Sequence, residues 1–137
     1  MLRYMLDTNL CIRVLRDRPA GLRERFNAEA ACLCISTVTL AELLYVAERS
    51  ARPSHARQEV EAFAARLEIL AFGPEAAGHY AEIRADLEHK GQMIGPYDLM
   101  IAGHARSRGL VVVTGNLREF NRVAGLRAED WLTPPAT

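Results

Sequence analysis

Short, uninterrupted apolar runs recur along this 137-residue chain, and each is followed or preceded by a segment with helical periodicity. Such runs are typical of strands buried on both faces, because a strand exposed on one face alternates apolar and polar residues. The runs cover residues 3–6, 31–36, 67–72 and 110–114. Strands that alternate with helices form parallel sheets. The pattern therefore predicts one α/β domain, with a central parallel β-sheet flanked by helices on both faces.

The segments between these runs place apolar residues three and four positions apart, which indicates amphipathic helices. We expect helices over residues 8–16, 22–30, 38–50, 55–67, 75–89 and 97–109. A last strand is expected within residues 126–131. No repeat or low-complexity linker divides the chain. Residues 1–132 are therefore expected to form one domain, and residues 133–137 a disordered tail.

Charge and cysteine content narrow the class of protein. The 17 basic and 17 acidic side chains cancel, so any attraction to nucleic acid must be local. Lys90 is the only lysine; the arginine bias suits phosphate binding, although a coding bias toward arginine is the favoured explanation. Cys11, Cys32 and Cys34 lack metal-ligand spacing and are expected to be reduced core residues of a cytoplasmic protein. No apolar run approaches the roughly 20 residues that cross a membrane.

Three carboxylates lie where predicted strands and helices meet. Asp7 follows the first strand, Glu42 lies early in the helix after the second, and Asp98 lies in the first turn of a later helix. Each has a purely structural explanation. Asp7 suits a helix N-cap, Glu42 follows Thr39 at the spacing of a capping box, and Asp98 complements the positive end of a helix.

The three acids together favour a functional interpretation. Ligands of parallel sheets bind beyond the carboxyl ends of the strands, and no lysine or arginine adjoins any of the three. Carboxylates gathered in apolar surroundings repel one another unless a cation lies between them. Oxygen ligands suit Mg²⁺ or Mn²⁺, which would promote hydrolysis of a phosphate ester. Thr114 and Asn116 add polar groups at a fourth strand end, where a simple turn explains them as well.

Taken together, MLDTN, the Glu42 of TLAEL, YDLMIAGHA and VVTGNLREF resemble the PIN-domain family, in the form found in VapC toxins of toxin–antitoxin pairs. The resemblance extends from Arg3 to Trp131. It implies a Mg²⁺-dependent endoribonuclease that cleaves tRNA or ribosomal RNA and thereby inhibits translation. It also implies a homodimer, a VapB-type antitoxin whose peptide arm covers the active site, and operator DNA bound only through that antitoxin.

The family's functional residues transfer to individual positions. The resemblance implies that Asp7, Glu42 and Asp98 bind the metal, that Asn9 supports Asp7, and that Thr114 is the small hydroxyl residue near the metal. Asn116 stands where many PIN domains carry a fourth acid, which weakens the expected second metal site. The catalytic set predicted on this basis comprises Asp7, Glu42, Asp98 and Asn116.

The expected reaction is attack of a metal-activated water on an RNA phosphodiester, which expels the 3′ oxygen and leaves a 5′ phosphate. Arginines at the rim are candidates for holding the RNA backbone, although each is as easily an ordinary surface residue. These candidates are Arg13, Arg16, Arg18, Arg106, Arg108 and Arg118.

Other functions fit the sequence less well. A haloacid-dehalogenase phosphatase needs an aspartate at position 9, which is asparagine, and a response-regulator receiver needs a lysine after a late strand. A ribonuclease H fold needs adjacent antiparallel hairpins, which the pattern does not predict. Two alternatives stay open: a catalytically idle PIN-fold protein that acts as a binding partner or co-repressor, and a different nuclease with clustered acids.

Overall fold

The computed structural model describes residues 1–132, and the expected tail over residues 133–137 lies outside the described part. A five-stranded parallel sheet forms the centre, in the order β3-β2-β1-β4-β5. The strands are β1 (Tyr4–Leu6), β2 (Leu33–Ser36), β3 (Glu68–Leu70), β4 (Val111–Thr114) and β5 (Ala128–Asp130). The predicted parallel sheet and its final strand are confirmed.

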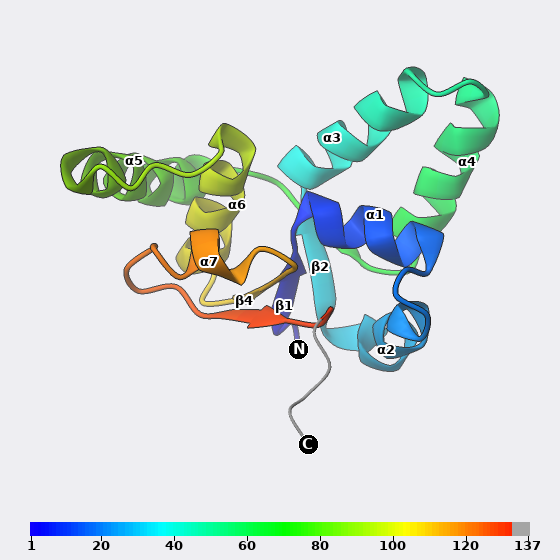
Figure 1. Ribbon diagram of the computed structural model, residues 1–137, viewed down its shortest axis with the longest axis horizontal. Coiled ribbons are helices and arrows are strands. Elements are labelled where there is room, and N and C mark those ends of the chain that lie inside the picture. Colours follow the sequence, from blue (N-terminus) through cyan, green and yellow to red (C-terminus); the bar gives the residue numbers. More distant parts are fainter. Residues whose placement is uncertain (133–137) are drawn as a thin grey trace.

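Helices cover both faces of this sheet (Figure 1). They are α1 (Thr8–Arg16), α2 (Leu22–Glu29), α3 (Thr37–Glu48), α4 (Pro53–Ala64), α5 (Pro74–Lys90), α6 (Pro96–Ser107) and the short α7 (Leu117–Phe120), with a 3-10 turn η1 (Ala30–Cys32) before β2. Helices α1 to α4 lie on one side of the sheet in Figure 1, and α5, α6 and α7 on the other.

Alternating side chains of the strands pack into two separate hydrophobic cores, one on each face of the sheet. Tyr4 and Leu6 of β1 pack into the core under α1 to α4, whereas Met5 between them packs into the core under α5 and α6. Val111 and Val113 of β4 share the first core, and Val112 the second. The apolar runs are continuous because both faces of the strands are buried, as the sequence predicted.

Element boundaries differ from expectation by a few residues. Helices α4, α5 and α6 each begin at a proline, one or two residues earlier than their apolar periodicity indicated. Proline favours the first helical position, where its missing N–H has no helical partner to lose. Strand β2 begins at Leu33 instead of residue 31, because η1 occupies the preceding residues.

The order of the strands places β1 at the centre of the sheet. The chain first moves outward from β1 through β2 to β3, and then returns to the other side of β1 with β4 and β5. The carboxyl ends of β1 and β4 therefore flank the point where the winding reverses. Ligands of doubly wound sheets bind at such a point.

Two further findings within residues 1–132 concern the cysteines and the lengths of the helices. Cys11, Cys32 and Cys34 are free thiols, and Cys11 and Cys34 are buried. None of the helices described is long and apolar enough to cross a membrane.

Helix α6 lies unusually close to α5 at Gly103. A β-carbon added there would lie 2.7 Å from the backbone nitrogen of Tyr80 and 2.8 Å from its α-carbon. Only glycine permits this close approach of α6 to α5.

We expect Gly103→Ala to destabilise the protein by about 1–3 kcal/mol, because the added methyl group must displace the backbone of α5. The control is Gly78→Ala at an exposed position of α5, where an added β-carbon has no neighbour within 4 Å. Alanine there is expected to stabilise the helix by about 0.5–1 kcal/mol. Urea unfolding of both variants measures the difference, and equal stability of the two would refute the close-packing argument.

Candidate active site

Asp7 lies at the end of the central strand and is 2% exposed. It is the N-cap of α1: its Oδ1 accepts a hydrogen bond from the backbone N–H of Leu10 at 2.8 Å. Its Oδ2 accepts a second hydrogen bond from the Thr114 hydroxyl at 2.5 Å. Burial raises the pKa of Asp7, the two hydrogen bonds lower it, and the nearby charges of Glu42 and Glu119 raise it. The capping and functional interpretations of Asp7 are thus compatible.

Glu42 lies on α3, half-buried and facing α1. Its Oε1 accepts a hydrogen bond from the Thr8 hydroxyl at 2.5 Å. The capping-box alternative for Glu42 is wrong, because the N-cap of α3 is Ser36, whose hydroxyl accepts from the N–H of Val38. The helix begins before Thr39, so Glu42 lies beyond its first turn and is free of any capping role.

Asp98 lies in the first turn of α6, where the sequence placed it. Its pKa is raised from 3.8 to about 7, chiefly by burial and then by a hydrogen bond to Glu119 and the charges of Asp7, Glu119 and Glu42. Asp7, Glu42 and Asp98 therefore interact electrostatically across one site, at the carboxyl edge of the sheet.

Glu119 is the site residue that the sequence interpretation missed. We expected Asn116 in place of a fourth acid, yet the fourth carboxylate comes from Glu119, one turn later on α7. Phe120 is fully buried at the end of this four-residue helix, and Glu119 beside it is half-buried and hydrogen-bonded to Asp98. The only sequence signal for it is an acid in VVTGNLREF, three residues after Asn116.

The polar residues around the acids divide into two groups. The hydroxyl of Thr114 contacts Asp7 directly, and the backbone N–H of Asn116 donates to that hydroxyl at 2.8 Å. The side chains of Asn9 and Asn116 are exposed and line the neighbouring groove. Among the described residues, Thr114 and Leu10 supply the hydrogen bonds to Asp7, so the structure does not support the expected role of Asn9.

The donor set suits a hard divalent cation. All four ionisable groups are carboxylates, and the hydrogen bond from Thr8 engages only one oxygen of Glu42. Over residues 1–132, no three His, Cys, Asp or Glu side chains form a ready-made metal cage. Mg²⁺ does not require one, since it retains several waters and is commonly held by one or two carboxylates.

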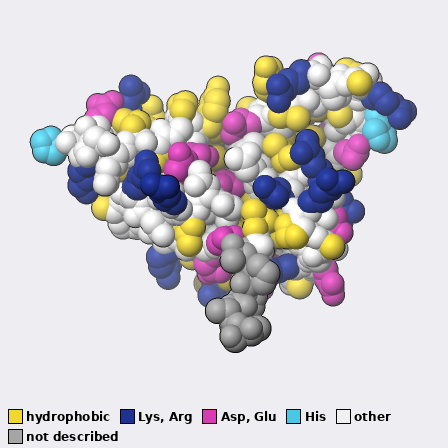
Figure 2. All heavy atoms as spheres, viewed as in Figure 1, with side chains coloured by type: hydrophobic (Ala, Val, Ile, Leu, Met, Phe, Trp, Pro, Cys, Tyr) yellow, Lys and Arg dark blue, Asp and Glu magenta, His cyan; other side chains and the backbone are white. Residues whose placement is uncertain are grey.

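A groove of about 520 Å³ adjoins the acids. Its lining comprises Asn9, Ile12, Arg13, Arg16, Arg18, Gly115, Asn116 and Leu132. Figure 2 shows basic side chains gathered over α1, beside acidic side chains near the middle of the same face. Three of the arginines predicted from the sequence to bind RNA, Arg13, Arg16 and Arg18, thus line one groove next to the carboxylates.

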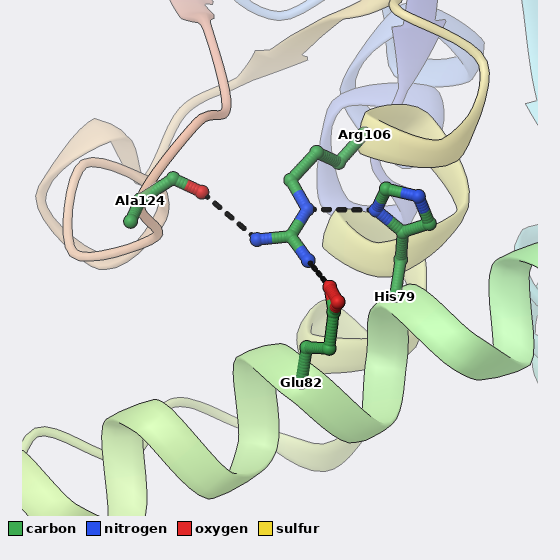
Figure 3. A network of polar contacts seen from close by, with 4 residues as sticks. All are labelled: His79, Glu82, Arg106 and Ala124. Carbon is green, nitrogen blue, oxygen red and sulfur yellow. Dashed lines mark hydrogen bonds and ion pairs between the residues drawn. The ribbon is translucent and has the colours of Figure 1, made fainter.

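Arg106 lies elsewhere and is largely engaged within the protein (Figure 3). Its Nε donates to His79 Nδ1 at 2.8 Å, and its other nitrogens reach Glu82 at 2.8 Å and the Ala124 carbonyl at 3.1 Å. This network joins α5, α6 and the segment after α7. The geometry therefore favours a structural role for Arg106, not the RNA contact expected for it. Arg118 is exposed on α7 beside Glu119.

The parallel sheet, its reversal point and the carboxylates at its edge define an α/β domain of nuclease type. The PIN domain family model matches residues 4–126. A tRNA(fMet)-specific endonuclease VapC from Shigella flexneri is 53% identical over 131 residues, covering 96% of this chain and 99% of the relative.

Solved structures give the same result. The crystal structure of DNA-bound VapBC from Salmonella typhimurium matches with a TM-score of 0.91 and 55% identity, over 96% of this chain and 99% of the matched one. VapBC2 from Rickettsia felis, bound to a promoter DNA fragment, matches with a TM-score of 0.88 and 34% identity, over 95% and 99% of the two chains. The chain belongs to the PIN-domain family, and within it to the VapC group of toxin ribonucleases.

The pKa of Asp98 predicts how the stability of the metal-free protein depends on pH. Above about pH 4 the unfolded chain loses this proton, whereas the folded chain keeps it until about pH 7. The folded state binds more protons in this window, so stability falls as pH rises from 4 to 7 and stays lower above it. With chelator present, we expect Asp98→Asn to reduce the fall in Tm between pH 4.5 and 8 by about 3 °C.

Asp86→Asn is the matched control, since Asp86 pairs with Lys90 on the surface of α5, away from the acids. Its Tm should follow the wild-type pH dependence. An equal fall in wild type and Asp98→Asn would show that Asp98 does not hold the raised pKa.

Proposed function

We propose that this chain is a Mg²⁺-dependent endoribonuclease, the toxin of a type II toxin–antitoxin pair, which inhibits translation by hydrolysing tRNA. The observation that carries the proposal is the cluster of Asp7, Glu42, Asp98 and Glu119 at the reversal point of the sheet. PIN-domain nucleases require a divalent metal. The choice of Mg²⁺, with Mn²⁺ as an alternative, rests on the all-oxygen donor set.

The substrate is proposed from the relatives. The VapC proteins from Shigella flexneri and Salmonella typhimurium, 53% and 55% identical to this chain, are named for cleavage of tRNA(fMet). We propose the same tRNA here, ahead of ribosomal RNA. The alternative of a catalytically idle co-repressor is less favoured, because the four carboxylates are assembled and Asp7 and Glu42 are held by hydrogen bonds.

The side chains of the site have different proposed roles in hydrolysis. Asp7 and Asp98 would hold the cation, with Glu42 and Glu119 as further ligands or as acceptors for its waters. A cation bound there supplies a water of lowered pKa and stabilises negative charge on the phosphate. Because the pKa of Asp98 is raised to about 7, a cation bound there would favour the loss of its proton. Hydrolysis of the P–O3′ bond would leave a 5′ phosphate and a 3′ hydroxyl.

The partners follow from the family. Solved relatives of this chain are complexes named VapBC, and two of those structures contain DNA. We propose a VapB-type antitoxin that covers the acids and makes the contacts to operator DNA. We also propose a cytoplasmic homodimer of the free toxin. Tyr45 and Tyr97, both exposed, line an apolar pocket beside Glu42 that is a candidate surface for this association. Light scattering of the free chain measures its mass directly.

We expect Asp7→Asn, Asp98→Asn and Glu119→Gln each to slow RNA cleavage by at least about 100-fold, because each removes a negative charge from the cation site. Cleavage of tRNA(fMet) is followed at fixed Mg²⁺ and lost on chelation. Asp86→Asn is the control with the same chemical change. Unchanged rates in the Asp7 and Asp98 variants would reject the nuclease assignment, whereas an unchanged Glu119→Gln rate would reject only the fourth acid.

We propose that Arg13, Arg16 and Arg18 hold RNA phosphates in the groove beside the acids. Substituting Arg13 or Arg16 by alanine should raise KM by about 5–10-fold with little change in kcat. The same substitutions should reduce the salt dependence of KM. Arg84→Ala is the matched control, because Arg84 pairs with Glu88 on the surface of α5. A wild-type KM and salt dependence in both groove variants would exclude the groove as the RNA path.

A further inference from the structure

Two acids of the site, Asp7 and Glu42, each accept a hydrogen bond from a threonine hydroxyl that contacts a further polar group. In the first of these hydrogen-bond chains, the N–H of Asn116 donates to the Thr114 hydroxyl at 2.8 Å, and that hydroxyl donates to Asp7 at 2.5 Å. In the second, the Thr8 hydroxyl lies 2.5 Å from Glu42 Oε1 and 3.4 Å from the Thr39 hydroxyl. The second chain joins two helices, since Thr8 opens α1 and both partners lie on α3.

The protons of the second chain have one favourable arrangement. A hydroxyl carries a single proton, and a carboxylate only accepts. Thr8 therefore donates its proton to Glu42, at the shorter distance, and its oxygen lone pairs face the hydroxyl of Thr39. Thr39 is fully buried and Thr8 is 8% exposed, so water has little access to compete for either group. A hydrogen bond to a charged acceptor is stronger than a neutral one.

This contact fixes the orientation of a flexible side chain. Glu42 has three rotatable bonds, and none of the ion pairs found among the described residues includes it. With Oε1 bound to Thr8, the remaining oxygen is left for a cation or its water. Outer partners of this kind orient metal ligands, and their loss typically costs 10–100-fold in metal affinity or activity.

We propose that Thr8 is a positioning residue, which acts through Glu42 and is supported by Thr39. The proposal rests on the proposed function, because it takes Glu42 as part of a divalent-cation site. It gives Thr8, the fourth residue of the MLDTN segment, a role distinct from that of Asp7: Asp7 belongs to the proposed cation site itself, whereas Thr8 sets the geometry of an acid on another helix.

The test compares Thr8→Val, which keeps the shape and removes the hydroxyl, with Thr8→Ser, which keeps the hydroxyl. Mn²⁺ binding is measured by electron paramagnetic resonance, independently of RNA cleavage. We expect Thr8→Val to weaken Mn²⁺ binding by about 10-fold and Thr8→Ser to restore most of it. Thr37→Val is the control, because Thr37 opens α3 but its hydroxyl accepts from the N–H of Phe72. It should bind Mn²⁺ as the wild type does.

A double-mutant cycle separates positioning from general stability. If Thr8 acts through Glu42, Thr8→Val should have no further effect on Mn²⁺ binding in a Glu42→Gln background. An undiminished effect there, wild-type binding by Thr8→Val, or equally weak binding by Thr8→Ser would each overturn the proposal. Should Thr8→Val fail to fold, Thr39→Val replaces it, with a smaller loss expected in the same direction and wild-type binding counting against the proposal.

RNA cleavage reports on a different question. If the wild type and Asp7→Asn cleave RNA equally, the proposed function fails, while the Mn²⁺ comparison still decides whether Thr8 positions Glu42. If Asp7→Asn is inactive and Thr8→Val binds Mn²⁺ normally, the function stands and the positioning role fails.

Discussion

A carboxylate buried at the end of the central strand is the constraint on which the site depends. Burying Asp7 without partners would be costly, so each of its oxygens needs a donor. The donors come from the first turn of α1 and from the end of β4. The backbone N–H of Asp7 donates to Val113 at 3.1 Å and continues the pairing of Leu6 with Val113. The register between β1 and β4 therefore determines whether Asp7 is satisfied.

The four acids have two kinds of surroundings. Asp7 and Glu42 each accept a hydroxyl hydrogen bond, whereas Asp98 is hydrogen-bonded to Glu119 and has a raised pKa, chiefly because of burial. Asp7 and Glu42 are thus held in place by side chains of the fold, whereas the raised pKa of Asp98 makes its charge depend on pH near neutrality. Helix α6, which carries Asp98, packs against α5 at Gly103. Arg106 of α6 also hydrogen-bonds to Ala124 in the segment after α7, the helix that carries Glu119.

Much of the site was predictable because strand ends are visible in a sequence. Asp7, Glu42 and Asp98 stand out as unpaired acids beside apolar runs, and the parallel sheet predicts their meeting at one edge. Glu119 escaped because its direction depends on a four-residue helix anchored by Phe120. Arg106 was placed at the RNA surface for the opposite reason: a sequence does not reveal which arginine already has three partners in the fold.

The sequence by itself determined the alternation of strands and helices, the burial of both sheet faces and the identity of three acids. These follow from local chemistry: apolar runs, helical periodicity and proline at helix starts. Only the tertiary structure decided which groups hold those acids, because Thr8 and Glu42 are 34 positions apart and Thr114 and Asp7 are 107 apart. Hydrogen bonds between such distant residues depend on strand register and helix packing, which the local pattern does not encode.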